Sequence, residues 1–195
     1  MRTLSTLSLL FVVASVPLAG AAQWGVTAEI GVARFGGTSR DSSGTQVGPY
    51  RPTTFELRLD RALGPTRVAI AAQYARTGIA GEGGGLAFVQ YDIASFWEIA
   101  PQISWRLARF GAGVDVRLEG GPAFTLWDIN GESRNRVGGR AAAAFEWPLA
   151  GGLRGSLRMG GVLSPSIFDA ADTPAGVERR ATRRFSVALG LRYEL

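Results

Sequence analysis

The sequence predicts an all-β protein, an eight-stranded antiparallel up-and-down β-barrel that spans a membrane. Three observations predict it. Segments in which polar and apolar residues alternate recur eight times, short and long connections between these segments alternate, and no stretch after residue 22 is long and apolar enough for a membrane helix. A closed barrel is the other structure that satisfies every backbone hydrogen bond inside a bilayer.

The alternation is clearest in residues 53–63, where Phe55 and Leu57 fall on one face of a strand while Glu56 and Arg58 fall on the other. Residues 184–195 at the end of the chain repeat this pattern. Six further segments fit the same template: residues 24–35, 66–77, 96–107, 113–126, 137–147 and 152–163. Segments of this length suit tilted strands that cross a membrane.

The connections predict which end of the barrel lies outside the cell. The second, fourth and sixth are short, at residues 63–65, 108–112 and 148–151. The first, third, fifth and seventh are longer, at residues 36–52, 78–95, 127–136 and 164–183. Outer-membrane barrels have short periplasmic turns and long external loops, so both ends of the chain are expected in the periplasm.

Local motifs refine this outline. The fourth strand has a second candidate start near Leu86, because residues 88–93 also alternate. Residues 128–132 are expected to form a tight turn rather than a calcium loop, and Gly121-Pro122 predicts a bulge or bend. A turn at 148–151 predicts that Glu146 and Arg154 lie opposite each other.

Residues 1–22 are predicted to be a cleaved export signal, separate from a barrel domain of residues 23–195. Arg2 gives a positive start, an apolar stretch follows to Val16, and Ala19-Gly20-Ala21 forms a cleavage signal, with Ala22 as the alternative last residue. The chain has no Cys, so neither disulfides nor a lipoprotein anchor are expected. Its net charge of +5 does not imply a nucleic-acid partner, because the chain is exported and its charges alternate along strands.

The polar faces carry acids and arginines in nearly equal numbers, as a narrow interior requires, because unpaired charge there is costly. The expected lumen charge network comprises Glu29, Glu56, Arg58, Asp60, Glu98, Arg106, Asp115, Arg117, Glu119, Arg140, Glu146, Arg154, Arg158 and Arg192. A soluble lipocalin-like binding barrel, with its apolar face inside, is the less favoured alternative.

The apolar faces carry aromatic residues near both ends, as the two girdles of a membrane barrel do. The expected girdle residues are Trp24, Phe55, Tyr74, Trp97, Trp105, Phe124, Trp147, Phe185 and Tyr193. Arginines at the outer ends of strands could contact lipopolysaccharide phosphates, or could equally be rim charges that extend into water. They are Arg34, Arg76, Arg179, Arg180 and Arg183.

Gly190, Tyr193 and Leu195 end the chain in a pattern similar to the terminal strand that the barrel-assembly machinery reads, with Leu in place of the common Phe. With this topology, the chain resembles the OmpA/OmpX-type family of small outer-membrane barrels. The resemblance implies the outer membrane of a diderm bacterium, with the barrel-assembly machinery and outer-membrane lipid as partners.

Familiar enzymes among outer-membrane barrels use a His near a Ser or carboxylate, and this chain has neither His nor Lys. No catalytic residue, metal or cofactor is therefore expected. We expect a structural or interaction role, with lipopolysaccharide or an external partner contacted through the loops and the lumen filled by side chains. A narrow channel for ions or small solutes is the alternative.

Overall fold

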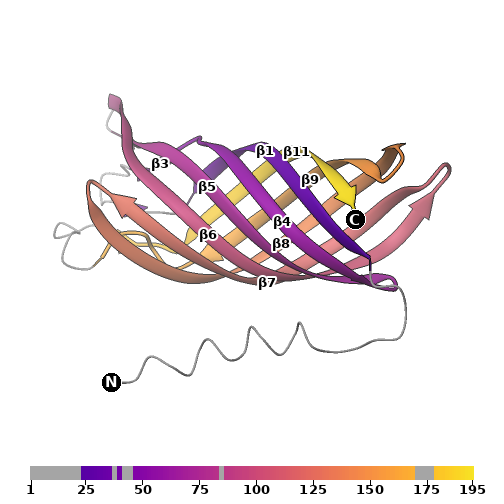
Figure 1. Cartoon of the computed structure of the whole chain (residues 1–195). Helices are drawn as coiled ribbons and strands as arrows, with labels where there is room; N and C mark the ends of the chain where they lie inside the picture. The colour runs from indigo at the N-terminus through magenta and orange to yellow at the C-terminus, as the bar shows by residue number, and fades with distance from the viewer. Residues whose placement is uncertain (1–22, 37–38, 41–45, 84–85, 170–177) are drawn as a thin grey trace, which may run out of the picture.

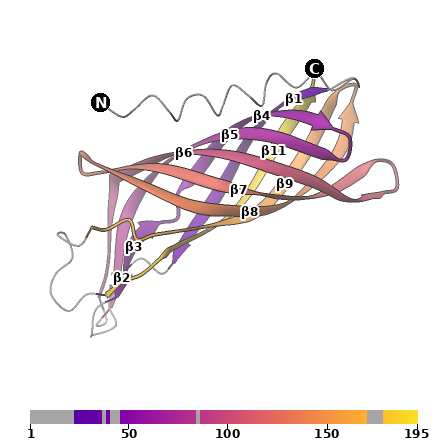
Figure 2. The same cartoon turned by 90° about the horizontal axis from the view of Figure 1, so that it is seen from below.

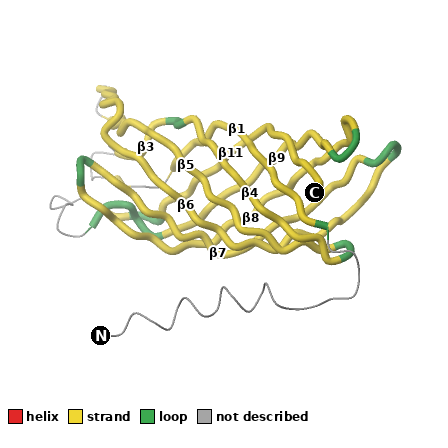
Figure 3. Tube along the Cα trace, viewed as in Figure 1, coloured by secondary structure: helices red, strands yellow, loops and turns green. Residues whose placement is uncertain are grey.

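The computed structural model describes residues 23–36, 39–40, 46–83, 86–169 and 178–195, so the expected export signal lies outside the described residues. The described chain is an antiparallel sheet closed into a ring (Figures 1 and 3). Eight long strands form the ring: β1 (Trp24–Gly36), β4 (Thr53–Leu63), β5 (Thr66–Gly83), β6 (Leu86–Phe110), β7 (Val114–Ile129), β8 (Glu132–Ala150), β9 (Leu153–Ser164) and β11 (Thr182–Glu194). Among the described residues, no helix is long and apolar enough to cross a membrane.

Each long strand pairs with its neighbours along the chain, and β1 pairs with β11 over twelve residue pairs, which closes the ring. Three short strands, β2 (Ser39–Arg40), β3 (Gln46–Tyr50) and β10 (Glu178–Arg179), lie at the end of the ring opposite the C-terminus (Figures 1 and 2). There β3 pairs with the last part of β5, from Gly78 to Glu82, and extends the wall of the barrel.

Two of the connections expected as long loops are mainly strand. The fifth shrinks to a two-residue turn at Asn130 and Gly131, whose φ angles of 58° and 85° match the Asn-Gly turns favoured in β-hairpins. The third becomes a long hairpin, since β5 continues to Gly83 and β6 starts at Leu86, the earlier of its two predicted starts.

The predicted register that places Glu146 directly opposite Arg154 is wrong, although the two side chains still form an ion pair at 3.8 Å. The turn between β8 and β9 lies at Gly151 and Gly152 rather than at residues 148–151, and Gly151 has a φ of 55° that glycine adopts without steric cost. A bulge between Pro148 and Ala150 shifts the register further, so that Glu146 faces Ser156 while Arg154 faces Pro148.

The strand faces divide as the alternation predicts. In β4, Phe55 and Leu57 are 54% and 62% exposed on the outside of the ring, whereas Glu56 and Arg58 are 4% and 6% exposed inside it. The polar face therefore lines most of the bore and the apolar face points outward. This arrangement is the inverse of a lipocalin-like binding barrel.

The expected irregularity at Gly121-Pro122 is an interruption between β6 and β7. The ladder pairs Ile99 with Phe124 and Ile103 with Gly120, and the residues between these pairs are not paired across β6 and β7. Because the register is the same on both sides, Pro101 stands opposite Pro122, and neither has an N–H group to donate. The backbones approach closely here, since a Cβ on Gly121 would lie 2.0 Å from the Pro101 carbonyl oxygen.

Candidate functional site

Ion pairs cross the bore of the barrel. Arg140 on β8 donates through Nη2 to Oε2 of Glu56 on β4 over 2.6 Å, and these two strands stand on opposite sides of the ring. Arg140 also lies 3.4 Å from Glu98, to which Arg184 donates over 2.7 Å. An eight-stranded barrel is just wide enough for its own side chains, so pairs that span it leave little open cross-section.

The centre of the bore holds three glutamates around two arginines. Arg58 lies 3.1 Å from both Glu29 and Glu119. Arg158 lies 3.0 Å from Glu119, 3.2 Å from Glu56 and 3.4 Å from Glu29. Every charge in this group therefore has at least two partners of opposite sign, which offsets the cost of removing it from bulk water.

A further layer of pairs lies toward the tight-turn end. Arg67 on β5 donates to both carboxylate oxygens of Glu146 on β8, over 2.7 and 2.8 Å. Asp60 accepts two hydrogen bonds from Arg192, at 3.1 and 2.8 Å. Together with the central group, this layer extends the charge network from the middle of the bore toward the tight-turn end.

The structure brings most of the predicted network together, with two departures. Arg106 is exposed and has no ion pair among the described residues, and Arg117 donates to Ser104 and to the Pro65 carbonyl rather than to a carboxylate. Arg154 reaches Asp115 at 3.2 Å and Glu146 at only 3.8 Å. Arg67 and Arg184 also join the network, on the inward face to which the alternation of their strands assigns them.

The outer part of the bore is apolar, which the sequence reasoning missed. A buried cluster fills it: Ala75, Ile79, Ala94, Phe96, Trp127, Ile129 and Ile167. The inward position of Phe96 and Trp127 follows from their parity with Glu98 and Thr125 on the same strands. Arg184 lies over the Phe96 ring at 4.8 Å and so joins the apolar cluster to the charge network.

Ile167 enters this cluster from the segment that follows β9, and its side chain is 0% exposed. Two arginines of β8 hold the segment in place. Arg136 donates to the backbone carbonyls of Ser166 and Ile167 and to the carboxylate of Asp169, and Arg134 donates to the Ile167 carbonyl. Residues 164–169, called the stopper segment below, thus place Ile167 inside the bore, between the charge network and the loop end of the barrel.

The predicted girdle residues all lie on the outward face. Tyr74 and Trp147 are half-buried and the other seven are exposed. Tyr74 packs against Trp97 with ring centroids 4.9 Å apart, and Trp147 lies over Gly155, where a Cβ would be 2.3 Å from its ring. These contacts place large rings on the outside of the wall near both of its ends.

The five predicted rim arginines are exposed as well. Arg34 on β1 and Arg183 on β11 lie near each other, because Gly36 pairs with Arg183 and Arg34 with Phe185. Arg180 is engaged by Glu178 at 2.8 Å. Arg76 is set apart from the others, on β5.

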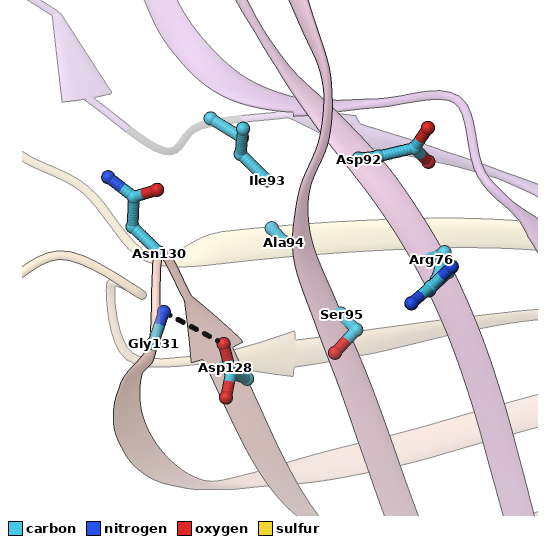
Figure 4. A pocket seen from close by; sticks show the side chains of 8 residues that line it. All are labelled: Arg76, Asp92, Ile93, Ala94, Ser95, Asp128, Asn130 and Gly131. Carbon is cyan, nitrogen blue, oxygen red and sulfur yellow. Dashed lines mark hydrogen bonds between the residues drawn. The ribbon is translucent and has the colours of Figure 1, made fainter.

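Arg76 borders a hollow of about 350 Å³ on the outer wall at the loop end of β5, β6 and β7 (Figure 4). Asp92 lies on the same side of the hollow as Arg76, Asp128 and Asn130 lie on the other side, and Ser95 stands between them. We call this hollow the rim pocket. Apart from Arg76, no residue of the pocket belongs to the predicted site set.

Comparisons with known proteins support the fold. No protein-family model and no curated protein matches the sequence. The solved structure of Neisserial surface protein A is 11% identical with a TM-score of 0.57, and the match covers 88% of this chain and 97% of that one. The outer membrane protein OprG from Pseudomonas aeruginosa is 10% identical with a TM-score of 0.57, over 90% of this chain and 96% of that one. The chain therefore has the fold of the small OmpA/OmpX-type outer-membrane β-barrels.

Proposed function

We propose that the protein is a non-enzymatic barrel of the outer membrane of a diderm bacterium, with a structural or interaction role and a lumen that does not conduct. The observation that carries this proposal is the 2.6 Å contact between Arg140 and Glu56 from opposite walls of the bore. Side chains that touch from opposite strands of an eight-stranded barrel leave little open cross-section for water or ions at that level. The stopper segment with its buried Ile167 supports a second closure above that level.

The outward face supports insertion in a membrane. Large apolar side chains such as Val32, Leu57 and Leu189 are more than half exposed between the two aromatic girdles. In water this continuous apolar wall would be unfavourable, whereas in a bilayer it meets lipid chains. The shared fold with solved outer-membrane barrels supports the same placement.

The rim arginines support contact with lipopolysaccharide. A guanidinium group offers paired N–H donors that match phosphate oxygens, and Arg34, Arg76 and Arg183 are exposed at the loop end of their strands. The outer strand extension around β3 and the external connections remain available for another partner. Insertion would depend on recognition of β11 by the barrel-assembly machinery, as the terminal residues Tyr193 and Leu195 suggest.

A narrow channel for ions or small solutes is the second candidate. Within the described part of the chain, the buried polar atoms Thr27 Oγ1, Gln102 Nε2 and Thr182 Oγ1 have no hydrogen-bond partner. Internal water satisfies such groups in folded proteins, and water in the bore would favour conduction if the ion pairs exchanged partners.

Single-channel recording on the purified protein in planar bilayers separates the two candidates. We expect no steady conductance from the wild-type protein. A large and steady conductance would contradict the closed barrel and favour the channel. Insertion is checked on gels, where unboiled protein should migrate differently from boiled protein, because closed barrels resist SDS until heated. Identical mobility would contradict a membrane barrel.

A further inference from the structure

The rim pocket lies directly above the outer aromatic girdle. Tyr74 on β5 pairs with Trp97 on β6. Two residues further along these strands, Arg76 pairs with Ser95, and Ser95 in turn pairs with Asp128 on β7. Two residues along a strand correspond to about 7 Å. Because aromatic girdles mark the edges of the hydrocarbon region, the row that contains Arg76 falls at the level of the lipid head groups.

The backbone builds this hollow rather than leaving it to flexible side chains. A bulge places Tyr91, Asp92 and Ile93 opposite the single residue Gly78, and Asp92 adopts a φ of 57°. The N–H of Asn130 donates to the Ile93 carbonyl over 2.9 Å and ties the two walls together. A Cβ on Gly78 would come within 2.5 Å of the Gln90 carbonyl oxygen, so the bulge depends on this glycine.

The charges of the rim pocket face the hollow without neutralising one another. Among the described residues, neither the Arg76 side chain nor the Asp92 side chain has an ion pair or hydrogen bond, and the Asp128 carboxylate accepts one hydrogen bond, from the N–H of Gly131 over 3.1 Å. Lumen arginines such as Arg58, Arg140 and Arg184 differ in this respect, since they reach carboxylates at 2.6–3.1 Å. An exposed guanidinium and two exposed carboxylates that share one hollow are therefore available to a ligand.

One arginine and two aspartates give the pocket a formal charge of −1. A phosphate alone would gain Arg76 but would be repelled by both carboxylates, and an amine alone would leave Arg76 without a partner. A ligand that carries a phosphate and an ammonium group satisfies all three charges. The volume of the hollow, about 350 Å³, lies at the lower end of the range for small-molecule sites.

We propose that the rim pocket binds a zwitterionic phosphate–ammonium head group, of the phosphoethanolamine type, carried by an outer-leaflet lipid. Arg76 holds the phosphate through its paired donors, and the hydroxyl of Ser95 donates to the same phosphate. Asp92 and Asp128 accept hydrogen bonds from the ammonium group. This inference rests on the proposed function for the membrane level of the pocket, and it names the chemistry that one rim arginine recognises.

The test measures binding of three soluble probes to the full-length mature protein in micelles of an uncharged detergent. The probes are O-phosphoethanolamine, inorganic phosphate and ethanolamine, each titrated by NMR or calorimetry with and without Ca²⁺. We expect wild type to bind phosphoethanolamine at least about tenfold more tightly than either other probe, since that ratio corresponds to one good charged hydrogen bond. Binding should not depend on Ca²⁺.

The variants keep the fold while they change the charges. Asp92→Asn suits the positive φ of this position, which Asn tolerates well, and Asp128→Asn retains an oxygen for the Gly131 N–H. We expect this pair of changes to abolish the preference for phosphoethanolamine over phosphate and Arg76→Gln to abolish binding of both. Arg51→Gln, an exposed arginine outside the pocket, is the matched control and should bind as wild type does.

Three outcomes would overturn the proposal. Equal affinity for inorganic phosphate would show a simple anion site, and binding of phosphate only with Ca²⁺ would show a cation bridge in place of the amine. An equal loss in the Arg51→Gln control would show a general charge effect. These failures are distinct from failure of the proposed function, which conductance and gel mobility of the wild-type protein decide.

Discussion

Glu56 contacts guanidinium groups from two neighbouring strands across the bore, β8 and β9, since Arg140 lies 2.6 Å and Arg158 lies 3.2 Å from its carboxylate. Substitution of such a residue is expected to be destabilising, because the arginines that contact it would stay confined in the lumen with too few hydrogen-bond acceptors. A buried charge that loses its partner is more costly than the loss of the attraction alone. The effects of replacing individual lumen charges are therefore expected to depend on one another.

Glu56→Gln should lower the free energy of unfolding by up to about 3–5 kcal/mol, and Arg140→Met by a similar amount, because each change removes the shortest contact of the other charge and leaves it only longer ones, to Arg158 or to Glu98. The double variant should lose less than the two single losses combined, with a coupling of roughly 0.5–3 kcal/mol. Urea unfolding in lipid vesicles, arranged as a double-mutant cycle, measures this coupling. Strictly additive losses would show that the two groups do not meet.

Arg180→Gln provides the control for this cycle. Arg180 also contacts a carboxylate, Glu178 at 2.8 Å, but the two side chains are 47% and 68% exposed. Surface pairs of this kind contribute little because water solvates both charges when they separate. The control should therefore unfold at the same urea concentration as the wild type.

The sequence predicts which charges face the bore, but it does not predict their partners. Alternation assigns Glu56 and Arg140 to the inside from their immediate neighbours alone. Their contact joins residues 84 positions apart, and it depends on the ring order that places β4 opposite β8. Alternation likewise assigns Arg106 to the lumen, although this residue, near the end of a long strand, is exposed to solvent.

At the scale of single strands, the facing prolines interrupt the ladder between β6 and β7. Gly121→Ala should destabilise the barrel by about 1–3 kcal/mol, because its Cβ would lie 2.0 Å from the Pro101 carbonyl oxygen and the backbones cannot separate freely. Gly139→Ala on the neighbouring strand is the matched control, since no atom lies within 4 Å of its Cβ position. The control should be neutral or slightly stabilising in the same unfolding assay.

The outward face of β9 allows a test of membrane depth. Leu157 pairs with Leu189 and Phe145 near the middle of the wall, so Leu157→Arg should cost about 2–4 kcal/mol in a bilayer. Leu163 lies on the same face of the same strand near its outer end, and Leu163→Arg should cost about 1 kcal/mol or less. Equal costs at both positions would contradict the depth profile, and no cost at Leu157 would mean that the faces are inverted.

The lengths of the strands were less predictable than their faces. Within the membrane, strand ends follow the apolar alternation, and β4 begins and ends where the sequence predicts. Beyond it, the chain has no lipid-facing pattern to preserve, and cross-strand pairing decides whether a segment is loop or strand. The pairing of β3 with β5, and the Asn130-Gly131 turn, extend the wall where alternation alone predicts loops.

For the molecule as a whole, the two closures act in series. The closure nearer the tight-turn end is the charge network, in which pairs such as Arg140–Glu56 cross the bore. The closure nearer the loop end is the apolar cluster, which Ile167 of the stopper segment completes. Arg134 and Arg136 of β8 hold that segment by hydrogen bonds to the Ile167 carbonyl. A solute would have to pass both, so opening either one alone should leave the barrel closed.

This arrangement predicts how conductance responds to mutation. Ile167→Asp should expel the stopper segment, because it places a charge among Phe96, Trp127 and Ile129, yet this variant should remain silent in single-channel recordings. Arg140→Gly with Arg158→Gly removes side chains that cross the bore and should also remain silent while the stopper is in place. The triple variant should conduct steadily. Conductance from Ile167→Asp alone would show that the charge network does not seal the lumen, and would favour the channel over the closed barrel.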